Sequence, residues 1–313
     1  MNRTRTSASE VAELLGLSKR ITYRRLNGET PFSDYEFALL CKHLGIPSNA
    51  LWEQSLPPLH FVAPIPADQP FVKQQYLARL QRAALAGKNQ DVVTEGVIAS
   101  DYLPLFYVYS EPSLALLTLY LFELPLKRTR VGQLLLEEYT ADNLDWLAAT
   151  GALSSDWFRR DSTEVWGHNT LDYLLGKLLS LRTSGLLPRD ADVATLFEAL
   201  DRLVDRLEQT LTSGDKPASG GGKLQVYRDW SSTVRNMMLL RGPRYRTLFL
   251  TFGTANFLNS NQPEAIDYFE RYFEAMQRIS EPVTGRAGGI RSMVNDLRRS
   301  VRDTRRRMEL IAG

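Results

Sequence analysis

The 313-residue sequence predicts a mainly α-helical protein with a small N-terminal domain (1–54) and a larger C-terminal α-helical domain (71–313). Short apolar patterns broken by glycine occupy the first part, and longer patterns at helical spacing occupy the second. A proline-rich stretch, 55–70, lies between them and predicts a stiff, extended linker. Apolar residues make up 43% of the chain, which is ample for a core.

Two short helices are expected within residues 8–26, which read ASEVAELLGLSKRITYRRL. The first has one apolar face and stops at Gly16. Ser18 can cap the second, because a small polar side chain accepts from free backbone N–H groups. A short helix, a glycine-containing turn and a basic helix together form the sequence pattern of a helix-turn-helix, which is typical of DNA binding.

The charge distribution of this domain favours the same interpretation. Residues 1–28 carry six basic and two acidic side chains, whereas residues 29–56 carry one basic and four acidic side chains. Positive charge is therefore concentrated on the half that would face DNA, where neutralised phosphates supply much of the affinity. A helical hairpin with a solvated basic face is the alternative.

Further helices follow the basic one. Asn27-Gly28 ends it, because these residue types tolerate a positive φ. The segment 31–44 predicts a third helix with four apolar positions, and Gly45 ends that helix. The next segment, IPSNALWE (46–53), predicts a short fourth helix with Ser48 as its N-cap.

With these elements the N-terminal domain resembles the Cro/CI-like (XRE) helix-turn-helix family. The resemblance rests on Ala12, Gly16, Leu17-Ser18, Gly28, the 31–44 helix, Gly45-Ile46 and Leu51. The implied DNA-binding residues are Ser7, Ser18, Lys19, Arg20, Tyr23, Arg24 and Arg25. Among them, exposed positions of the second helix read bases and the two serines lie near phosphates. The chain departs from the family at Thr22, where a buried aliphatic residue is commoner, and in having only six residues before the motif where the family usually has a full first helix.

The C-terminal domain reads as mostly helical. Apolar spacing predicts helices at 72–85, 113–121, 131–139, 141–149, 169–181, 192–211 and 263–279. The β-branched segment 91–99 could be a strand or the start of a helix. A short β-hairpin around a Gly-Pro turn, with strands at 237–240 and 247–252, is an option within this mainly α fold. The loop at 212–223 contains no phosphate-binding pattern.

Residues 162–259 also resemble the C-terminal half of uncharacterised bacterial helix-turn-helix regulators. The similarity is carried by STEVWGHNTLDYLL, LRTSGLL, LFEALDRLVDRL, VYRDW and TLFLTFGTANFLNS, in that order. It implies a regulatory partner domain and indicates no particular ligand.

Aromatic residues are the most notable group in this domain. Candidates are Tyr102, Phe106, Tyr107, Tyr109, Tyr120, Phe122, Trp146, Trp157, Trp166 and Trp230. They could line a ligand pocket. Packing in the core and at a dimer interface is the alternative, and we favour it because no polar groups visibly converge on these residues.

The C-terminal segment 286–311 predicts an arginine-rich helix. Ile290, Val294, Leu297 and Val301 recur at alternating spacings of four and three, which places them on one face. The flanking position holds Arg291, Arg298 and Arg305, and no acidic residue complements them within the helix. We therefore expect the apolar stripe to dock on the domain or on a partner subunit rather than form a free coiled coil. A nucleic-acid role for the arginine face is the alternative.

Several classes of protein are disfavoured by the sequence. A lone cysteine, Cys41, excludes an intrachain disulfide and a cysteine cluster for zinc. The three histidines are far apart and suggest no metal site, and no cofactor motif or nucleophile elbow is present. The chain shows no leader segment, and its most apolar run (114–126) is too short to span a bilayer. A cytoplasmic protein that is not an enzyme and does not bind membranes is expected.

Together these observations predict a sequence-specific transcriptional regulator that binds double-stranded DNA as a homodimer. Its C-terminal domain would serve dimerisation or sense a small-molecule or protein effector. The competing hypothesis is a helical scaffold or signalling protein that recruits protein partners, with a weak or vestigial DNA-binding module.

Overall fold

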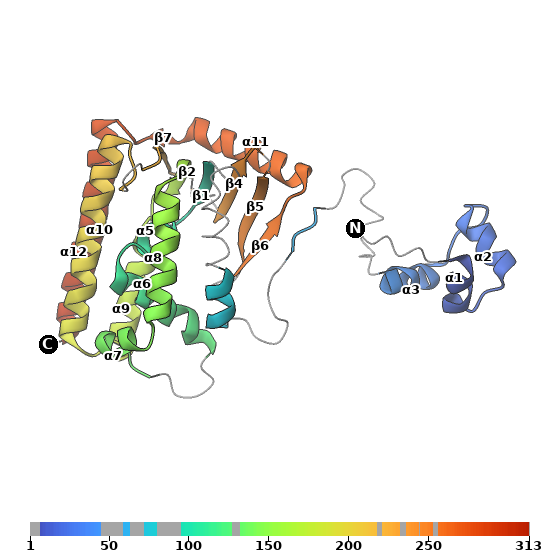
Figure 1. Cartoon of the computed structure of the whole chain (residues 1–313), viewed down its shortest axis with the longest axis horizontal. Helices are drawn as coiled ribbons and strands as arrows, with labels where there is room; N and C mark the ends of the chain where they lie inside the picture. Colours follow the sequence, from blue (N-terminus) through green and yellow to red (C-terminus); the bar gives the residue numbers. More distant parts are fainter. Residues whose placement is uncertain are drawn as a thin grey trace. The chain divides into compact units, whose positions relative to one another are not determined.

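The computed structural model divides the chain into two compact units, unit 1 (Met1–His60) and unit 2 (Phe61–Gly313) (Figure 1). It describes residues 7–44, 59–62, 72–79, 95–126, 132–217, 221–231, 236–243, 245–252 and 256–312. The predicted fourth helix, at 46–53, and most of the predicted linker 55–70 lie outside these residues.

Unit 1 contains three short helices. They are α1 (Ala8–Leu15), α2 (Lys19–Leu26) and α3 (Asp34–Leu44), and α1 packs against both of the others. Buried side chains come from all three helices and are Val11, Ala12, Thr22, Leu40 and Cys41. The single cysteine is thus a small core residue, as its apolar helix predicted.

The predicted fold class is wrong for unit 2, which has an α/β fold. Its centre is a seven-stranded mixed sheet with the strand order β6-β5-β4-β1-β2-β3-β7. The strands are β1 (Glu95–Ser100), β2 (Asp161–Gly167), β3 (Leu224–Asp229), β4 (Met237–Gly242), β5 (Tyr245–Phe252), β6 (Asn256–Ser260) and β7 (Glu281–Pro282). Strands β1, β2 and β3 are parallel, and β4, β5 and β6 continue the sheet as an antiparallel meander from β1.

Two of the parallel strands, β2 and β3, were not predicted, and the segment of β1 was left open between strand and helix. Helices cover both faces of this part of the sheet, so β1 and most of β2 are buried on both sides and lack the alternation of a half-exposed strand. β2 also contains Ser162 and Glu164, which are buried polar residues. The hairpin expected at 237–252 exists, but as β4 and β5 of the larger sheet.

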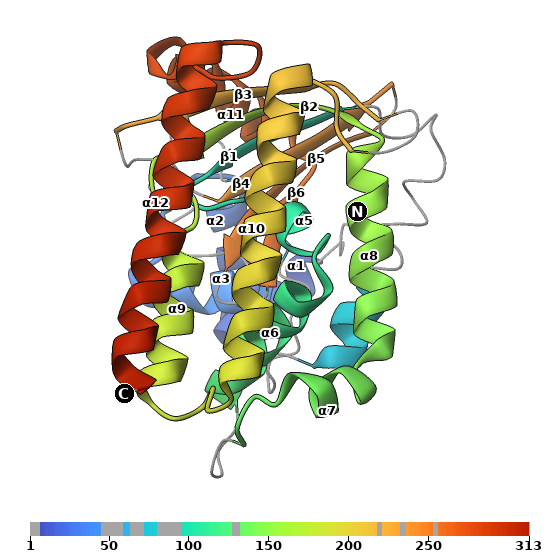
Figure 2. The same ribbon diagram turned by 90° about the vertical axis from the view of Figure 1, so that its left-hand side faces the viewer.

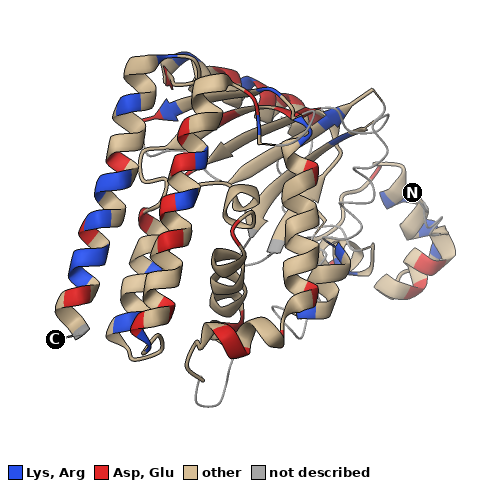
Figure 3. Ribbon diagram, turned by 60° about the vertical axis from the view of Figure 1, so that its left-hand side comes forward, with Lys and Arg blue, Asp and Glu red and all other residues tan. Residues whose placement is uncertain are grey.

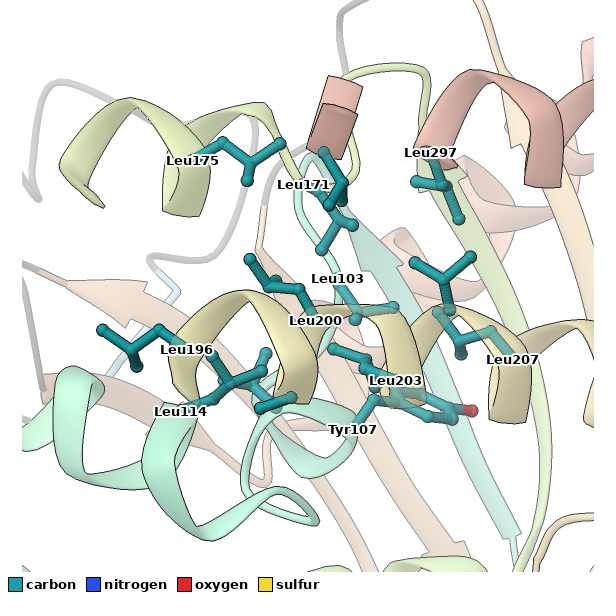
Figure 4. Close-up of a cluster of buried hydrophobic side chains, with 14 of the residues drawn as sticks. Leu103, Tyr107, Leu114, Leu171, Leu175, Leu196, Leu200, Leu203, Leu207 and Leu297 are labelled. Atoms are coloured by element: carbon teal, nitrogen blue, oxygen red, sulfur yellow. The ribbon is translucent and has the colours of Figure 1, made fainter. Parts of the chain in front are cut away.

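The helices follow the predicted pattern more closely. In unit 2 they include α5 (Leu105–Val108), α6 (Pro112–Glu123), α7 (Leu136–Ala141), α8 (Leu144–Phe158), α9 (Asp172–Thr183), α10 (Asp190–Ser213), α11 (Pro263–Ile279) and α12 (Ala287–Ala312), with a 3-10 turn at Leu124–Leu126. A further helical segment occupies 73–79. The predicted bounds of α11 match, and the amphipathic pattern of α10 is confirmed by its buried leucines (Figure 4).

The sheet separates two hydrophobic cores. On one face, α11 packs its buried Ile266, Phe269 and Phe273 against the sheet. On the other face, α5, α6, α8, α9, α10 and α12 build the larger core, in which α10 is central. Figure 4 shows Leu196, Leu200, Leu203 and Leu207 of α10 within this core, and labelled side chains around them come from α5, α6, α9 and α12.

Docking of the C-terminal helix is confirmed. Ile290, Val294, Leu297 and Val301 are all at most 7% exposed, and α12 packs beside α9 and α10 (Figure 2). Two arginines of α12 find their acidic partners on α10. Arg298 pairs with Asp205 at 2.8 Å and Glu208 at 2.7 Å, and Arg305 pairs with Asp201 at 2.6 Å.

Among the described residues, none of the helices has the length and apolar character needed to cross a bilayer.

Candidate nucleic-acid interface and apolar pocket

Local hydrogen bonds define the α1–turn–α2 geometry. Ser7 and Glu10 form a reciprocal capping box, in which the Glu10 amide donates to Ser7 Oγ at 3.3 Å and the Ser7 amide donates to Glu10 Oε2 at 2.6 Å. The hydrogen bond from the Ser7 amide also holds the pKa of Glu10 below its usual value. Gly16 ends α1 with φ of 65°, a conformation that favours glycine. Ser18 then caps α2 through the Ile21 amide at 3.4 Å.

Thr22 is the position at which the sequence departs from the helix-turn-helix family, and the structure explains how it fits. Its side chain is 0% exposed, and its hydroxyl donates to the Ser18 carbonyl at 3.1 Å. Because the polar group is satisfied within α2, the residue buries its methyl group without leaving a donor unpaired. The departure therefore does not prevent α2 from packing on α1.

One face of α2 is exposed and basic. Lys19, Arg20, Tyr23 and Arg24 all lie at the surface, with Tyr23 55% exposed. Within the described part of unit 1, neither Lys19 nor Arg20 forms an ion pair, whereas Arg24 pairs with the exposed Glu29 at 3.3 Å. The helix dipole disfavours cations in a first turn, so the position of Lys19 and Arg20 adds no stability to α2. Two cations beside the free backbone N–H groups of a helix N-terminus favour the binding of an anion there.

Arg25 has a different environment from these four residues. Its guanidinium forms an ion pair with Glu36 of α3 and lies over the Phe32 ring at 5.9 Å. The side chain is only 20% exposed. Arg25 therefore joins α2 to α3, and of the seven predicted DNA-binding residues it has the least surface to offer a ligand. Ser7 and Ser18 are exposed and act as helix caps.

Unit 2 contains an apolar pocket of about 470 Å³. One wall is the sheet face formed by β1, β4, β5 and β6, and the opposite walls are the segment 73–79, α5, α6, α8 and α9. The lining is rich in aromatic side chains, namely Tyr76, Tyr102, Phe106, Tyr109, Phe122, Trp157, Tyr173, Tyr245, Phe249 and Phe257. Five of the ten aromatic residues singled out in the sequence line this pocket. Tyr107, Tyr120, Trp146 and Trp166 are buried in the core without lining it, and Trp230 is 54% exposed.

Tight packing forms one end of this pocket. The Trp157 ring stacks on Phe106 at 4.4 Å and lies against the backbone of Gly96 in β1. A Cβ atom at Gly96 would lie 2.1 Å from the Trp157 ring, so only glycine fits there. The sequence signal for this contact is the glycine inside a strand, which often marks a close approach by another group.

A buried polar network lies on the face of the parallel strands that packs against α5. Glu164 in β2 is 0% exposed and accepts hydrogen bonds from Ser162 Oγ at 2.6 Å, Tyr107 OH at 3.0 Å and Trp166 Nε1 at 2.8 Å. These three donors saturate much of the carboxylate's accepting capacity. Sequence reasoning missed this network, because its members come from β2 and from α5, 57 residues apart.

Lys216 is a buried cation near this network. Its ammonium group donates to the carbonyl oxygens of Trp157 at 3.3 Å and Arg160 at 2.8 Å, and it lies over the Trp157 ring. Burial lowers the pKa of Lys216 to about 8, although the charges of Glu164 and Asp161 act in the opposite direction.

This lowered pKa predicts a pH-dependent stability. Between about pH 8 and 10 the unfolded chain keeps a proton on Lys216 that the folded chain releases, so the free energy of unfolding should rise with pH by about 2 kcal/mol. Burial raises the pKa of Tyr107 and Tyr109, so above about pH 10 the unfolded chain releases tyrosine protons that the folded chain keeps. The free energy of unfolding then falls with pH, which sets the upper limit of the pH range for this test. Denaturant titrations followed by tryptophan fluorescence measure the effect. Lys216→Met should remove the rise; an equal rise in the variant would contradict this assignment.

Among the described residues, no three histidine, cysteine, aspartate or glutamate side chains are grouped so that they could hold a metal ion. Comparison of the chain with family models, curated proteins and solved structures finds no match.

Proposed function

We propose that this protein is a sequence-specific DNA-binding transcriptional regulator. The observation that carries the proposal is the exposed basic face of α2, formed by Lys19, Arg20, Tyr23 and Arg24. Two of these cations occupy a helix N-terminus that they do not stabilise, which favours an external anion as their partner. Arg24 and Tyr23 lie one turn further along the same face and can reach base edges from a helix placed in the major groove.

The proposal includes a homodimer. One short recognition helix makes few contacts, and two copies on half-sites separated by about one turn of DNA supply the affinity that a specific site needs. Unit 2 would then carry the dimer contacts and sense an effector. Such a regulator would act in the cytoplasm, where the DNA of a bacterial cell lies.

Selection of a binding site from random duplexes, followed by mobility-shift titration at fixed salt, tests the proposal. Arg20→Ala and Arg24→Ala should each weaken binding to the selected site by about 5- to 150-fold, because each base contact contributes about 1–3 kcal/mol. Arg278→Ala is the matched control, since it removes an exposed arginine from α11 in unit 2. The selected site should contain two related half-sites.

The control should bind like the wild type. Equal affinity of all three variants for the selected site would contradict the assignment of α2 as the recognition helix. Failure of the full chain to select any sequence, with unit 1 folded by circular dichroism, would favour the helical scaffold hypothesis instead.

A further inference from the structure

The apolar pocket of unit 2 lies where the sheet changes direction. β1 is parallel to β2 on one side and antiparallel to β4 on the other, and Ser100, the last residue of β1, lines the pocket. Ligands of α/β proteins commonly bind at such positions, beyond the carboxyl ends of parallel strands. Figure 1 shows that β4, β5 and β6 form the part of the sheet farthest from α10 and α12, the long pair of packed helices.

The lining has the chemistry of a small-molecule site. Its volume of about 470 Å³ lies within the range of pockets that bury small organic ligands. Aromatic rings approach from both sides, with Phe249 and Phe257 on the sheet and Phe106 and Trp157 on the helices. Met238 of β4 adds an adaptable side chain to the sheet wall.

Several polar groups of this lining already have partners, and the guanidinium of Arg79 lies over the Tyr76 ring at 5.5 Å. The hydroxyls of Thr118 and Thr170 already donate to backbone carbonyls, at 2.9 Å and 2.8 Å. The charged pair Asp156 and Arg160 is joined by two hydrogen bonds, from Arg160 Nε at 3.1 Å and Arg160 Nη2 at 2.8 Å. Their charges therefore neutralise one another, and an ionic ligand gains little from them.

Asn236 differs from these groups. Its Oδ1 lies 2.7 Å from Ser100 Oγ, and its backbone carbonyl accepts from the Thr251 amide at 2.9 Å. Its Nδ2 makes no hydrogen bond within the described part of the chain. The side chain lines the pocket, so this amide group supplies two donors to a mainly apolar space.

From this arrangement we infer that the pocket binds an uncharged, mainly aromatic small molecule with a hydrogen-bond acceptor at one end. The rings stack between the aromatic side chains of the sheet and helix walls, and the acceptor meets Asn236 Nδ2. The site lies within unit 2 and does not depend on DNA binding by unit 1.

The experiment titrates the full-length protein with prodan, an uncharged naphthalene with a single ketone whose emission reports both polarity and hydrogen bonding to that ketone. Binding should be saturable with one molecule per chain. Met238→Trp and Leu153→Trp fill the pocket from opposite walls, and each should weaken binding by at least about tenfold. Ile279→Trp is the control, because it adds the same ring at a position that is 72% exposed.

A second variant tests the acceptor contact. Asn236→Ala should shift the emission of bound prodan to shorter wavelength and weaken binding, because the ketone loses its donor. Binding of prodan that does not saturate would overturn the inference. So would unchanged affinity in both tryptophan variants, provided that their melting temperatures match that of the wild type. Stronger competition by dodecanoate than by 2-acetylnaphthalene would overturn the aromatic class in favour of an acyl chain. DNA binding is measured separately, so its failure leaves this result intact.

Discussion

Replacing Leu297 by aspartate should lower the free energy of unfolding by about 4 kcal/mol. The side chain is 5% exposed in the contact of α12 with the body of unit 2, so the change removes a buried leucine and introduces a carboxylate among buried apolar side chains. Figure 4 shows Leu297 above the α10 leucines Leu203 and Leu207. Denaturant unfolding of the full-length chain measures the effect.

Arg299→Ala provides the control on the outward face of α12. That side chain is 66% exposed and forms an ion pair with Asp296 of the same helix, at 3.5 Å. Its removal should change stability by less than about 0.5 kcal/mol. An unchanged melting temperature and sedimentation coefficient for Leu297→Asp would show that α12 is a loose tail in solution and would contradict its docking on α9 and α10.

The second large effect concerns Glu164. Glu164→Leu should cost about 3–5 kcal/mol, because it leaves the buried donors of Ser162, Tyr107 and Trp166 without their acceptor and removes the carboxylate whose charge favours protonated Lys216. Unfolding followed by tryptophan fluorescence is suited to this test, since four of the five tryptophans lie in unit 2.

Glu198→Leu is a matched substitution at an exposed position of α10. It should be close to neutral in stability. If Glu164→Leu unfolded at the same denaturant concentration as Glu198→Leu and the wild type, the buried carboxylate would not hold the three donors in solution. Glu164→Gln should fall between the wild type and Glu164→Leu, because an amide oxygen can replace only part of the accepting capacity.

Exposed amphipathic helices are the part of the fold that could be predicted. Helix α11 follows its predicted bounds, and the apolar stripe of α12 is buried as its spacing requires. The Arg298 and Arg305 pairs illustrate the limit of this reasoning, because their acidic partners lie on α10, 90 or more residues away in the chain. Periodicity identified the face of α12 and could not identify the helix that it meets. Figure 3 shows the basic residues along α12 and the acidic residues along the neighbouring α10.

The sheet could not be predicted in the same way. Helices bury β1 and most of β2 on both sides, so these two strands carry no clear period-two signal. The pairing of these strands depends on contacts between residues that are far apart in the sequence. The sequence of 91–99 left strand and helix open, and the register of β1 with β2 and β4 resolves it as a strand from Glu95 to Ser100.

The exposed face of α2 and the pocket of unit 2 also differ in how far their residues could be predicted from local sequence. Residues of α2 are neighbours in sequence, so spacing alone places Lys19, Arg20, Tyr23 and Arg24 on one face. Even there, the ion pair of Arg25 with Glu36 depends on α3 and was not foreseen. The pocket draws its lining from elements between Tyr76 and Phe257, and no local pattern marks residues so far apart as one site.

The salt dependence of duplex-DNA binding by the full-length chain tests the central claim most directly. Phosphate contacts release counterions, so the logarithm of the binding constant should fall linearly with the logarithm of salt concentration, with a slope of about −0.9 for each phosphate neutralised. We predict a steep slope for the wild type and for Arg278→Ala, and a clearly shallower one when Lys19 and Arg20 are both replaced by alanine. Equal slopes for all three proteins, or no measurable binding to duplex DNA at low salt, would contradict the assignment of α2 as a DNA-binding helix.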